Sequence, residues 1–212
     1  MNLYPIYLHL EGRRCIVVGA GRVAERKVVG LRAAGANICL VSPEATPNLQ
    51  ALAEEGAVEW LKEPYRTAHL EGAFMAMACS DKRQVNATVV RDAKRRNMLL
   101  LVADDPKAGS FMSPIQVTRG DLVLTVSTGG QSPTLAAVLR ERLEAQFGPE
   151  WETLVELMGN AREVVKTNPE EAGRKAAVRR VLDDSQVHAL LAAGQRLEAE
   201  TRIRECLSLS LE

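Results

Sequence analysis

The chain has 212 residues, enough for one sizeable domain and a smaller second part. Its 27 lysines and arginines balance 27 aspartates and glutamates, so it lacks the basic excess that nucleic-acid binders usually show. The amino terminus does not have the pattern of a signal peptide, and no apolar run approaches the roughly 18 residues needed to cross a membrane. We therefore expect a cytoplasmic protein that binds neither nucleic acid nor membrane.

A glycine-rich turn between a strand and a helix is the first motif in the chain. Cys15–Val18 has the composition of a buried strand, and Gly19 and Gly21 follow it. The first glycine permits a tight turn, the second would let a pyrophosphate approach the backbone, and Ala24 lets the helix pack closely on the strand. The free N–H groups at the start of that helix would face the phosphates. The pattern predicts a dinucleotide site; the alternative is a turn whose small residues serve packing alone.

The end of the second strand, predicted over Asn37–Val41, decides which dinucleotide fits. Such sites usually carry an acidic residue there for the ribose hydroxyls. Ser42 stands in that place, followed by Pro43 and Glu44. Ser42 could bind the ribose itself, or Glu44 could turn back toward it. Because no arginine stands at this tip to bind a 2′-phosphate, the sequence favours NAD over NADP.

Strands and helices alternate up to about residue 112. The predicted elements are a helix over Asn48–Glu55, strands over Val58–Leu61, Phe74–Cys79 and Met98–Ala103, and a helix over Val85–Arg96. Apolar residues make up 46% of the chain and aromatic residues only 4%, so the core must be aliphatic, as in doubly wound sheets. We therefore predict an α/β fold over 1–112, a Rossmann-like doubly wound parallel sheet with helices on both faces.

Cysteines and histidines do not form a metal-binding pattern. Cys15, Cys39 and Cys79 fall in predicted core strands, Cys206 falls in a predicted helix, and no C-x-x-C pair occurs. The three histidines lie far apart in the sequence. We interpret the cysteines as small buried hydrophobic residues of a reduced protein and predict no metal site.

Two aspartates, Asp104 and Asp105, follow the last predicted strand of this part, with Pro106 and Lys107 after them. Open α/β sheets place their ligands at the carboxyl ends of strands. A carboxylate there could act as a general base. It could equally cap backbone N–H groups in an Asp-Pro turn. The residues alone leave both interpretations open.

The pattern changes after residue 112. Apolar residues alternate from Ile115 to Val126 around a turn at Gly120, which predicts a β-hairpin. The turn 127–133 leads into a helix that Ser132 caps, and it is either an anion cradle or an ordinary strand-to-helix turn. Because a two-stranded ribbon cannot bury both faces alone, we expect 113–148 to pair with another chain. Helices over 151–166, 169–182 and 185–206 predict a helical domain, 149–212.

Several motifs together resemble the precorrin-2 dehydrogenase / sirohydrochlorin ferrochelatase family, the amino-terminal module of siroheme synthases. The resemblance covers roughly residues 3–145. It rests on Leu3–Leu8, Val17–Lys27, Ser80-Asp81, Val85-Asn86, Asp104–Phe111 and Val126–Pro133.

The resemblance implies NAD-dependent oxidation of precorrin-2 to sirohydrochlorin, with Asp104 as proton acceptor. Some members also insert Fe²⁺ into the product in the same cleft. The family's NAD contacts fall on Gly21, Arg22, Val23, Ala24, Pro43 and Glu44. The tetrapyrrole cleft would be lined by Ser127, Thr128, Gly129, Gly130 and Ser132. Lys107 and Arg22 are candidate partners for substrate carboxylates, and Arg119 is a weaker one.

The family is a homodimer that exchanges its central segment, which agrees with the ribbon expected to pair with another chain. Two narrower alternatives stay open. In one, the protein only dehydrogenates and inserts no metal. In the other, it is a dimeric NAD-binding sensor without catalysis, and the segment that begins with Asp104 is merely a turn.

Overall fold

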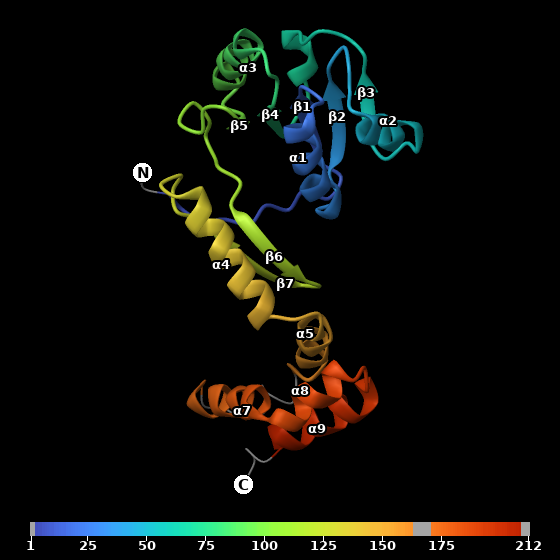
Figure 1. The fold of residues 1–212 in the computed structure, drawn as a ribbon, viewed down its shortest axis with the longest axis vertical. Coiled ribbons are helices and arrows are strands. Elements are labelled where there is room, and N and C mark those ends of the chain that lie inside the picture. The colour runs from blue at the N-terminus through green and yellow to red at the C-terminus, as the bar shows by residue number, and fades with distance from the viewer. Residues whose placement is uncertain (1–2, 163–170, 209–212) are drawn as a thin grey trace. The chain divides into compact units, whose positions relative to one another are not determined.

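The computed structural model describes residues 3–162 and 171–208 (Figure 1). The chain forms two compact units, Met1–Ser113 and Pro114–Glu212. The further boundary predicted between residues 148 and 149 would fall inside the second unit and stays a prediction.

The first unit is built around a five-stranded parallel sheet in the order β3-β2-β1-β4-β5. Its strands are β1 (Arg14–Val18), β2 (Asn37–Val41), β3 (Glu59–Leu61), β4 (Met75–Ala78) and β5 (Leu99–Val102). Val18, at the end of β1, is paired with Val41 on one side and Ala78 on the other. The carboxyl ends of the strands therefore share one edge. The point where the strand order reverses lies between β1 and β4, where such sheets bind ligands.

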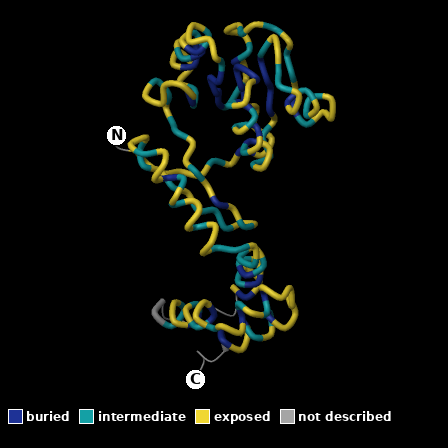
Figure 2. Tube along the Cα trace, in the orientation of Figure 1, coloured by how far each residue is buried: buried dark blue, intermediate teal, exposed yellow. Residues whose placement is uncertain are grey.

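Helices cover both faces of this sheet. One face packs against α1 (Arg22–Ala33) and α2 (Pro47–Glu54), and the other against η1 (Thr67–Leu70) and α3 (Arg83–Arg95). Successive residues along each inner strand join opposite hydrophobic clusters. Because both faces are covered, these strands are apolar throughout and appear as buried segments in Figure 2. The predicted doubly wound fold is confirmed.

The helix ends of the first unit follow the expected local chemistry. α1 buries Ala24, Val28 and Leu31, as predicted, and the chain turns at Gly35 with φ of 71°. α3 begins at Arg83, two residues before the predicted start. Asn97 follows its last turn with φ of 50°, a left-handed conformation that asparagine tolerates.

The second unit begins with the predicted antiparallel hairpin, β6 (Ile115–Arg119) and β7 (Leu122–Val126), which turns at Gly120. Helix α4 (Pro133–Gln146) packs against this hairpin. The remaining helices are α5 (Glu150–Asn160), α7 (Glu171–Asp183), α8 (Ser185–Ala192) and α9 (Arg196–Ser208). They share a hydrophobic core that includes Leu154, Val181, Val187 and Ile203.

Two predicted helices of this unit differ from the structure. The helix predicted over 185–206 is two helices, because the chain breaks at Gly194, where φ is 71°. The helix predicted over 151–166 ends at Asn160, after Gly159, and both residues have low helix propensity. Its predicted last turn, and the predicted helix start at 168–170, lie outside the described residues. No helix in the described part of the chain combines the length and apolarity that would let it span a bilayer.

Candidate active site

Gly19 lies at the point where the strand order reverses. Its N–H donates to the Val41 carbonyl (3.0 Å), which continues the ladder between β1 and β2. Its φ is 95°, and a Cβ at this position would lie 2.7 Å from backbone atoms of both Cys79 and Ser80. The turn after β1 and the turn after β4 are therefore in direct backbone contact, and only glycine fits between them.

Gly21 is open where Gly19 is enclosed. It caps α1 with extended backbone (φ −89°), and a Cβ there would meet no atom within 4 Å. The N–H groups of Arg22, Val23 and Ala24 have no acceptor in the described part of the chain. Three free amides at a helix start beside an open backbone form a site for an anion such as a pyrophosphate.

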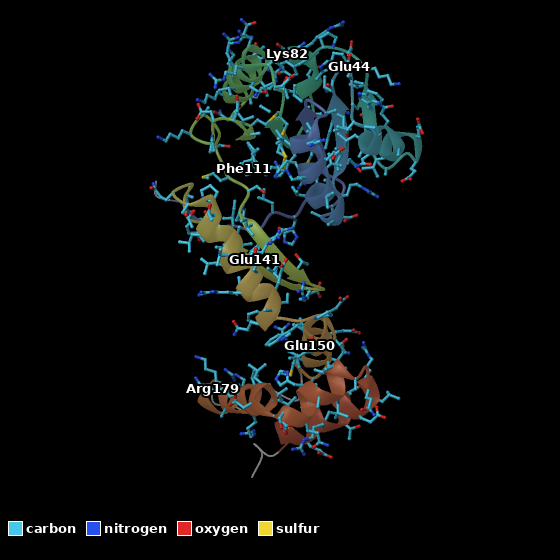
Figure 3. All side chains as sticks on the ribbon, in the orientation of Figure 1. Glu44, Lys82, Phe111, Glu141, Glu150 and Arg179 are labelled. Atoms are coloured by element: carbon cyan, nitrogen blue, oxygen red, sulfur yellow. The ribbon has the colours of Figure 1, made fainter. Side chains whose placement is uncertain are left out.

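The loop after β2 approaches the same turn. The Thr46 N–H donates to the Ala20 carbonyl (3.0 Å), and the Ser42 carbonyl accepts from the Trp60 indole (2.9 Å). Ser42 is half-buried, whereas Pro43 and Glu44 are exposed. Figure 3 labels Glu44 and Lys82, which follow β2 and β4 and lie at the same end of the sheet. The predicted ribose-binding tip thus shares an edge with the glycine turn.

A pocket of about 550 Å³ lies beside this turn and is lined by Arg22, Glu25, Arg26, Thr46, Pro47 and Asn48. The Thr46 hydroxyl is buried and has no hydrogen-bond partner among the described residues. A buried hydroxyl without a partner carries a cost that a ligand can remove. Together with the open Gly21 backbone and the free amides, it fits a dinucleotide cofactor. Another pocket, of about 220 Å³, is lined by residues that include Asn37 and lies toward the start of β2, away from the glycine turn.

Asp104 follows β5 and is tied to the turn after β4 through Asn86. The Asn86 side chain on α3 is only 3% exposed. It accepts from the Ser80 N–H (3.1 Å), donates to the Ser80 carbonyl (2.9 Å) and donates to Asp104 Oδ1 (3.0 Å). The other oxygen, Asp104 Oδ2, has no partner in the residues that the structure describes, and Asp104 is exposed. Contacts therefore run from Gly19 through Ser80 and Asn86 to Asp104.

Asp105 behaves differently from its neighbour. Its Oδ1 accepts from the Lys107 N–H (3.1 Å), so it caps the turn as an ordinary Asp-Pro loop would. The loop is anchored further along, where Ser110 exchanges hydrogen bonds with Leu100 and a Cβ on Gly109 would lie 2.7 Å from the Leu100 carbonyl. Of the two interpretations left open by the sequence, the Asp-Pro turn thus describes Asp105, and the general-base role of Asp104 stays a prediction. Lys107 itself is exposed.

Cys79, directly after β4, and Lys27, on α1, are close enough to influence each other's pKa. Burial raises the pKa of the Cys79 thiol to about 11, while the Lys27 charge lowers it and the Asp104 charge raises it. Burial lowers the pKa of the Lys27 ammonium, and the charge on Arg26 adds to this effect. Cys79 is therefore a neutral thiol at pH 7 and not a nucleophile. All four cysteines are buried and free, as predicted.

The loop 127–132 in the second unit is closed by its own hydrogen bonds. Thr128 Oγ1 accepts from the Ser132 N–H (3.1 Å) and donates to the Ser132 carbonyl (3.2 Å), so this hydroxyl shapes the loop. Ser127 Oγ accepts from the Gly129 N–H, and Ser132 Oγ caps α4 by accepting from the Leu135 N–H, both at 3.2 Å. The hydroxyl hydrogens of Ser127 and Ser132 stay available to an anion, whereas that of Thr128 is used.

Arg119 also has internal partners, because its guanidinium donates to the Phe147 and Thr118 carbonyls. Sequence reasoning did not assign roles to Asn86, Lys27 or Thr46. Asn86 could have been found, since it stands in the first turn of the helix that follows β4, and β4 ends beside the glycine turn. Within the described residues, no group of three or more histidine, cysteine, aspartate or glutamate side chains could hold a metal ion.

Comparison with known proteins identifies the first unit. The family described as "Putative NAD(P)-binding" matches residues 6–115. The chain belongs to this family. The prediction of a nicotinamide dinucleotide cofactor is thereby confirmed. A second family, described as "Sirohaem biosynthesis protein central", matches residues 119–146, which span the hairpin and α4.

The relatives of this NAD(P)-binding family member confirm the resemblance predicted from the motifs. "Siroheme synthase 1" of Aeromonas salmonicida is 36% identical over 200 residues, covering 94% of this chain and 43% of that protein. "Siroheme synthase" of Chromobacterium violaceum is 37% identical over 207 residues, covering 96% and 44%. The chain thus spans less than half the length of these relatives. In fold it is similar to "SirC, precorrin-2 dehydrogenase", with a TM-score of 0.73 and 23% identity over 96% of this chain and all of that one.

Proposed function

We propose that this chain oxidises precorrin-2 to sirohydrochlorin with NAD. The observation that carries the proposal is the state of Asp104, which has one oxygen held by Asn86 and the other without a partner among the described residues. This carboxylate stands at the carboxyl edge of the sheet, connected to the glycine turn through Ser80. A dehydrogenase needs a proton acceptor near its cofactor, and we assign that role to Asp104.

The chain's own residues divide the work. The amides after Gly21 would bind the pyrophosphate, and Ser42, Pro43 and Glu44 would hold the ribose, where the Glu44 carboxylate disfavours a 2′-phosphate. NAD, when bound, supplies the hydride acceptor. Asp104 Oδ2 would take the proton that substrate oxidation releases. Oδ1, as the acceptor of the Asn86 amide, would hold the carboxylate in place.

The substrate is a polyanion, so its carboxylates need cations and N–H or O–H donors. In the first unit, Lys107 and Arg22 are exposed cations on segments beside the glycine turn and Asp104. In the second unit, Ser127, Gly130 and Ser132 keep donors available, with Thr128 and Gly129 shaping the loop that presents them. We infer that each of these sets, taken by itself, can bind carboxylates of such a substrate.

A second copy of this chain is the proposed partner. In the hairpin only Val117 is buried, and in α4 only Ala136. Leu135 and Val138, three residues apart on α4, are 51% and 41% exposed, so two large apolar side chains of this helix face solvent in the single chain. A two-stranded ribbon under one helix is marginally stable alone, and a homodimer would cover it. We place the dimer in the cytoplasm, where the four free cysteines stay reduced.

The test compares NADH formation by wild type and by Asp104→Ala, with precorrin-2 generated in place and NAD affinity measured in parallel. The proposal predicts NADH formation by wild type, loss of turnover in the variant, and equal NAD affinity. NAD binding without turnover by wild type would favour the non-catalytic sensor instead. Incubation with sirohydrochlorin and Fe²⁺ tests iron insertion separately, against the spontaneous rate.

A further inference from the structure

We propose that Asn86 is a positioning residue that fixes the Asp104 carboxylate as a base. The inference rests on the proposed function, and it assigns a role to a residue on a helix that contributes no other group to the site. Asn86 and Asp92 are the two buried polar or charged side chains among the described residues. Because a buried amide needs hydrogen-bond partners, the contacts of Asn86 call for an explanation.

The hydrogen bonds determine which way the Asn86 amide faces. The Ser80 N–H can only donate, so the atom opposite it must be Oδ1. The amide nitrogen then carries two hydrogens, one for the Ser80 carbonyl and one for Asp104 Oδ1. Both N–H donors of the amide are used. A different rotamer of Asn86 would break its hydrogen bonds to Ser80.

This arrangement has a chemical consequence for Asp104. Because one acceptor site of Oδ1 is already used by the amide, Oδ1 is the more hindered of the two oxygens toward a further donor. Oδ2 is the more open oxygen for receiving a proton. Asn86 therefore favours Oδ2 as the proton-accepting oxygen and restrains rotation of an exposed carboxylate on a loop. It also joins that carboxylate to the Ser80 backbone, which is in contact with the Gly19 turn.

The restraint should affect the chemical step more than binding. Misplacing a catalytic group by about 1 Å can cost on the order of 100-fold in rate. We expect Asn86→Ala to lower kcat by roughly 10- to 100-fold, with the KM for precorrin-2 and the Kd for NAD changed by less than about 3-fold. Asn86→Asp keeps the acceptor for the Ser80 N–H but replaces both donors, so it should lower kcat at least as much.

A matched control lies on the same helix. Asp92 is 1% exposed and accepts hydrogen bonds from Tyr65, Thr67 and Arg91. It lies six residues along α3 from Asn86, which is about 9 Å on a helix. Asp92→Asn disturbs an equally buried polar network without touching Asp104, so it should lower stability while kcat stays within about 2-fold of wild type.

The experiment measures kcat, KM, NAD affinity and urea stability for wild type, both Asn86 variants and Asp92→Asn. A selective fall in kcat for both Asn86 variants supports the inference. Parallel losses of kcat, NAD affinity and stability in the Asn86 variants, matched by Asp92→Asn, would mean that Asn86 serves only the stability of the fold. A folded Asn86→Asp protein with the kcat of wild type would overturn the role of Asn86 but leave the proposed function intact. If wild type itself forms no NADH, the proposed function fails and the role of Asn86 fails with it.

Discussion

Three glycines in and before α1 should respond to alanine in three different ways. Gly21 has extended backbone and open space around its would-be Cβ, so alanine fits the protein without strain. The same Cβ occupies the space through which a pyrophosphate would reach the amides after it. Gly19 has φ of 95° and backbone neighbours 2.7 Å from a Cβ. Gly30, inside the helix, would meet nothing within 4 Å.

The magnitudes follow from these surroundings. Gly21→Ala replaces one N-cap residue by a poorer one, which costs about 0.5–1 kcal/mol of stability. Losing one charge-assisted hydrogen bond to the pyrophosphate costs about 1.5–3 kcal/mol, or roughly 10- to 150-fold in the Kd for NAD. Gly19→Ala combines left-handed strain with overpacking against backbone and should cost roughly 2–5 kcal/mol of stability. Gly30→Ala should gain up to about 1 kcal/mol and leave NAD affinity unchanged.

The assay needs stability and NAD affinity from the same proteins. The chain has two tryptophans, Trp60 in the first unit and Trp151 in the second. In a Trp151→Phe background, the fluorescence of Trp60 reports urea unfolding of the first unit, and calorimetric titration gives the Kd for NAD. The reasoning is refuted if Gly21→Ala binds NAD as wild type does, or if it loses as much stability as Gly19→Ala.

Three further outcomes are expected. The hydrogen bond from Arg202 lowers the pKa of Asp184 from its ordinary 3.8 to about 2. The stability that the Asp184 carboxylate adds to the second unit is therefore present above about pH 4 and is lost as the pH falls toward 2. Asp184→Asn should cost about 1 kcal/mol at pH 7 and flatten that acid loss in urea titrations; an unchanged profile would contradict the assignment. Val138→Asp should convert a dimer into a monomer by light scattering, and a monomeric wild type would remove the proposed interface. Asp105→Ala should lower the free energy of unfolding by about 1 kcal/mol but keep kcat within about 3-fold of wild type. A fall in kcat as large as that of Asp104→Ala would instead assign the role of base to Asp105.

The sheet and its glycine turn could be predicted because each rests on local chemistry. Continuous apolar strands, a glycine turn and a helix with a buried face are typical of a parallel sheet that is covered on both faces. The tight contact of Gly19 with Ser80 could not be predicted, since it joins segments about 60 residues apart. The same holds for Asn86, whose bond to Asp104 depends on how β4, β5 and α3 pack.

The prediction of a single helix over 185–206 was wrong because of the backbone conformation at one residue. Gly194 lies within a helical pattern and looks tolerable there, yet the core of the second unit folds the chain back at this residue. The turn 127–132 shows the same limit for side chains. The sequence suggests that a threonine in a glycine-rich loop has a free hydroxyl. In the structure, Thr128 Oγ1 forms hydrogen bonds with both the N–H and the carbonyl of Ser132.

The most direct test of the account is the stoichiometry of the reaction. Precorrin-2 and NAD are incubated anaerobically with wild type, and NADH and sirohydrochlorin are quantified from their absorbance over time. Removing one hydride and one proton from each substrate molecule predicts equal amounts of NADH and sirohydrochlorin, and neither product in the Asp104→Ala protein. Sirohydrochlorin that accumulates without matching NADH, or at the same rate in Asp104→Ala, would contradict the assignment of cofactor and base.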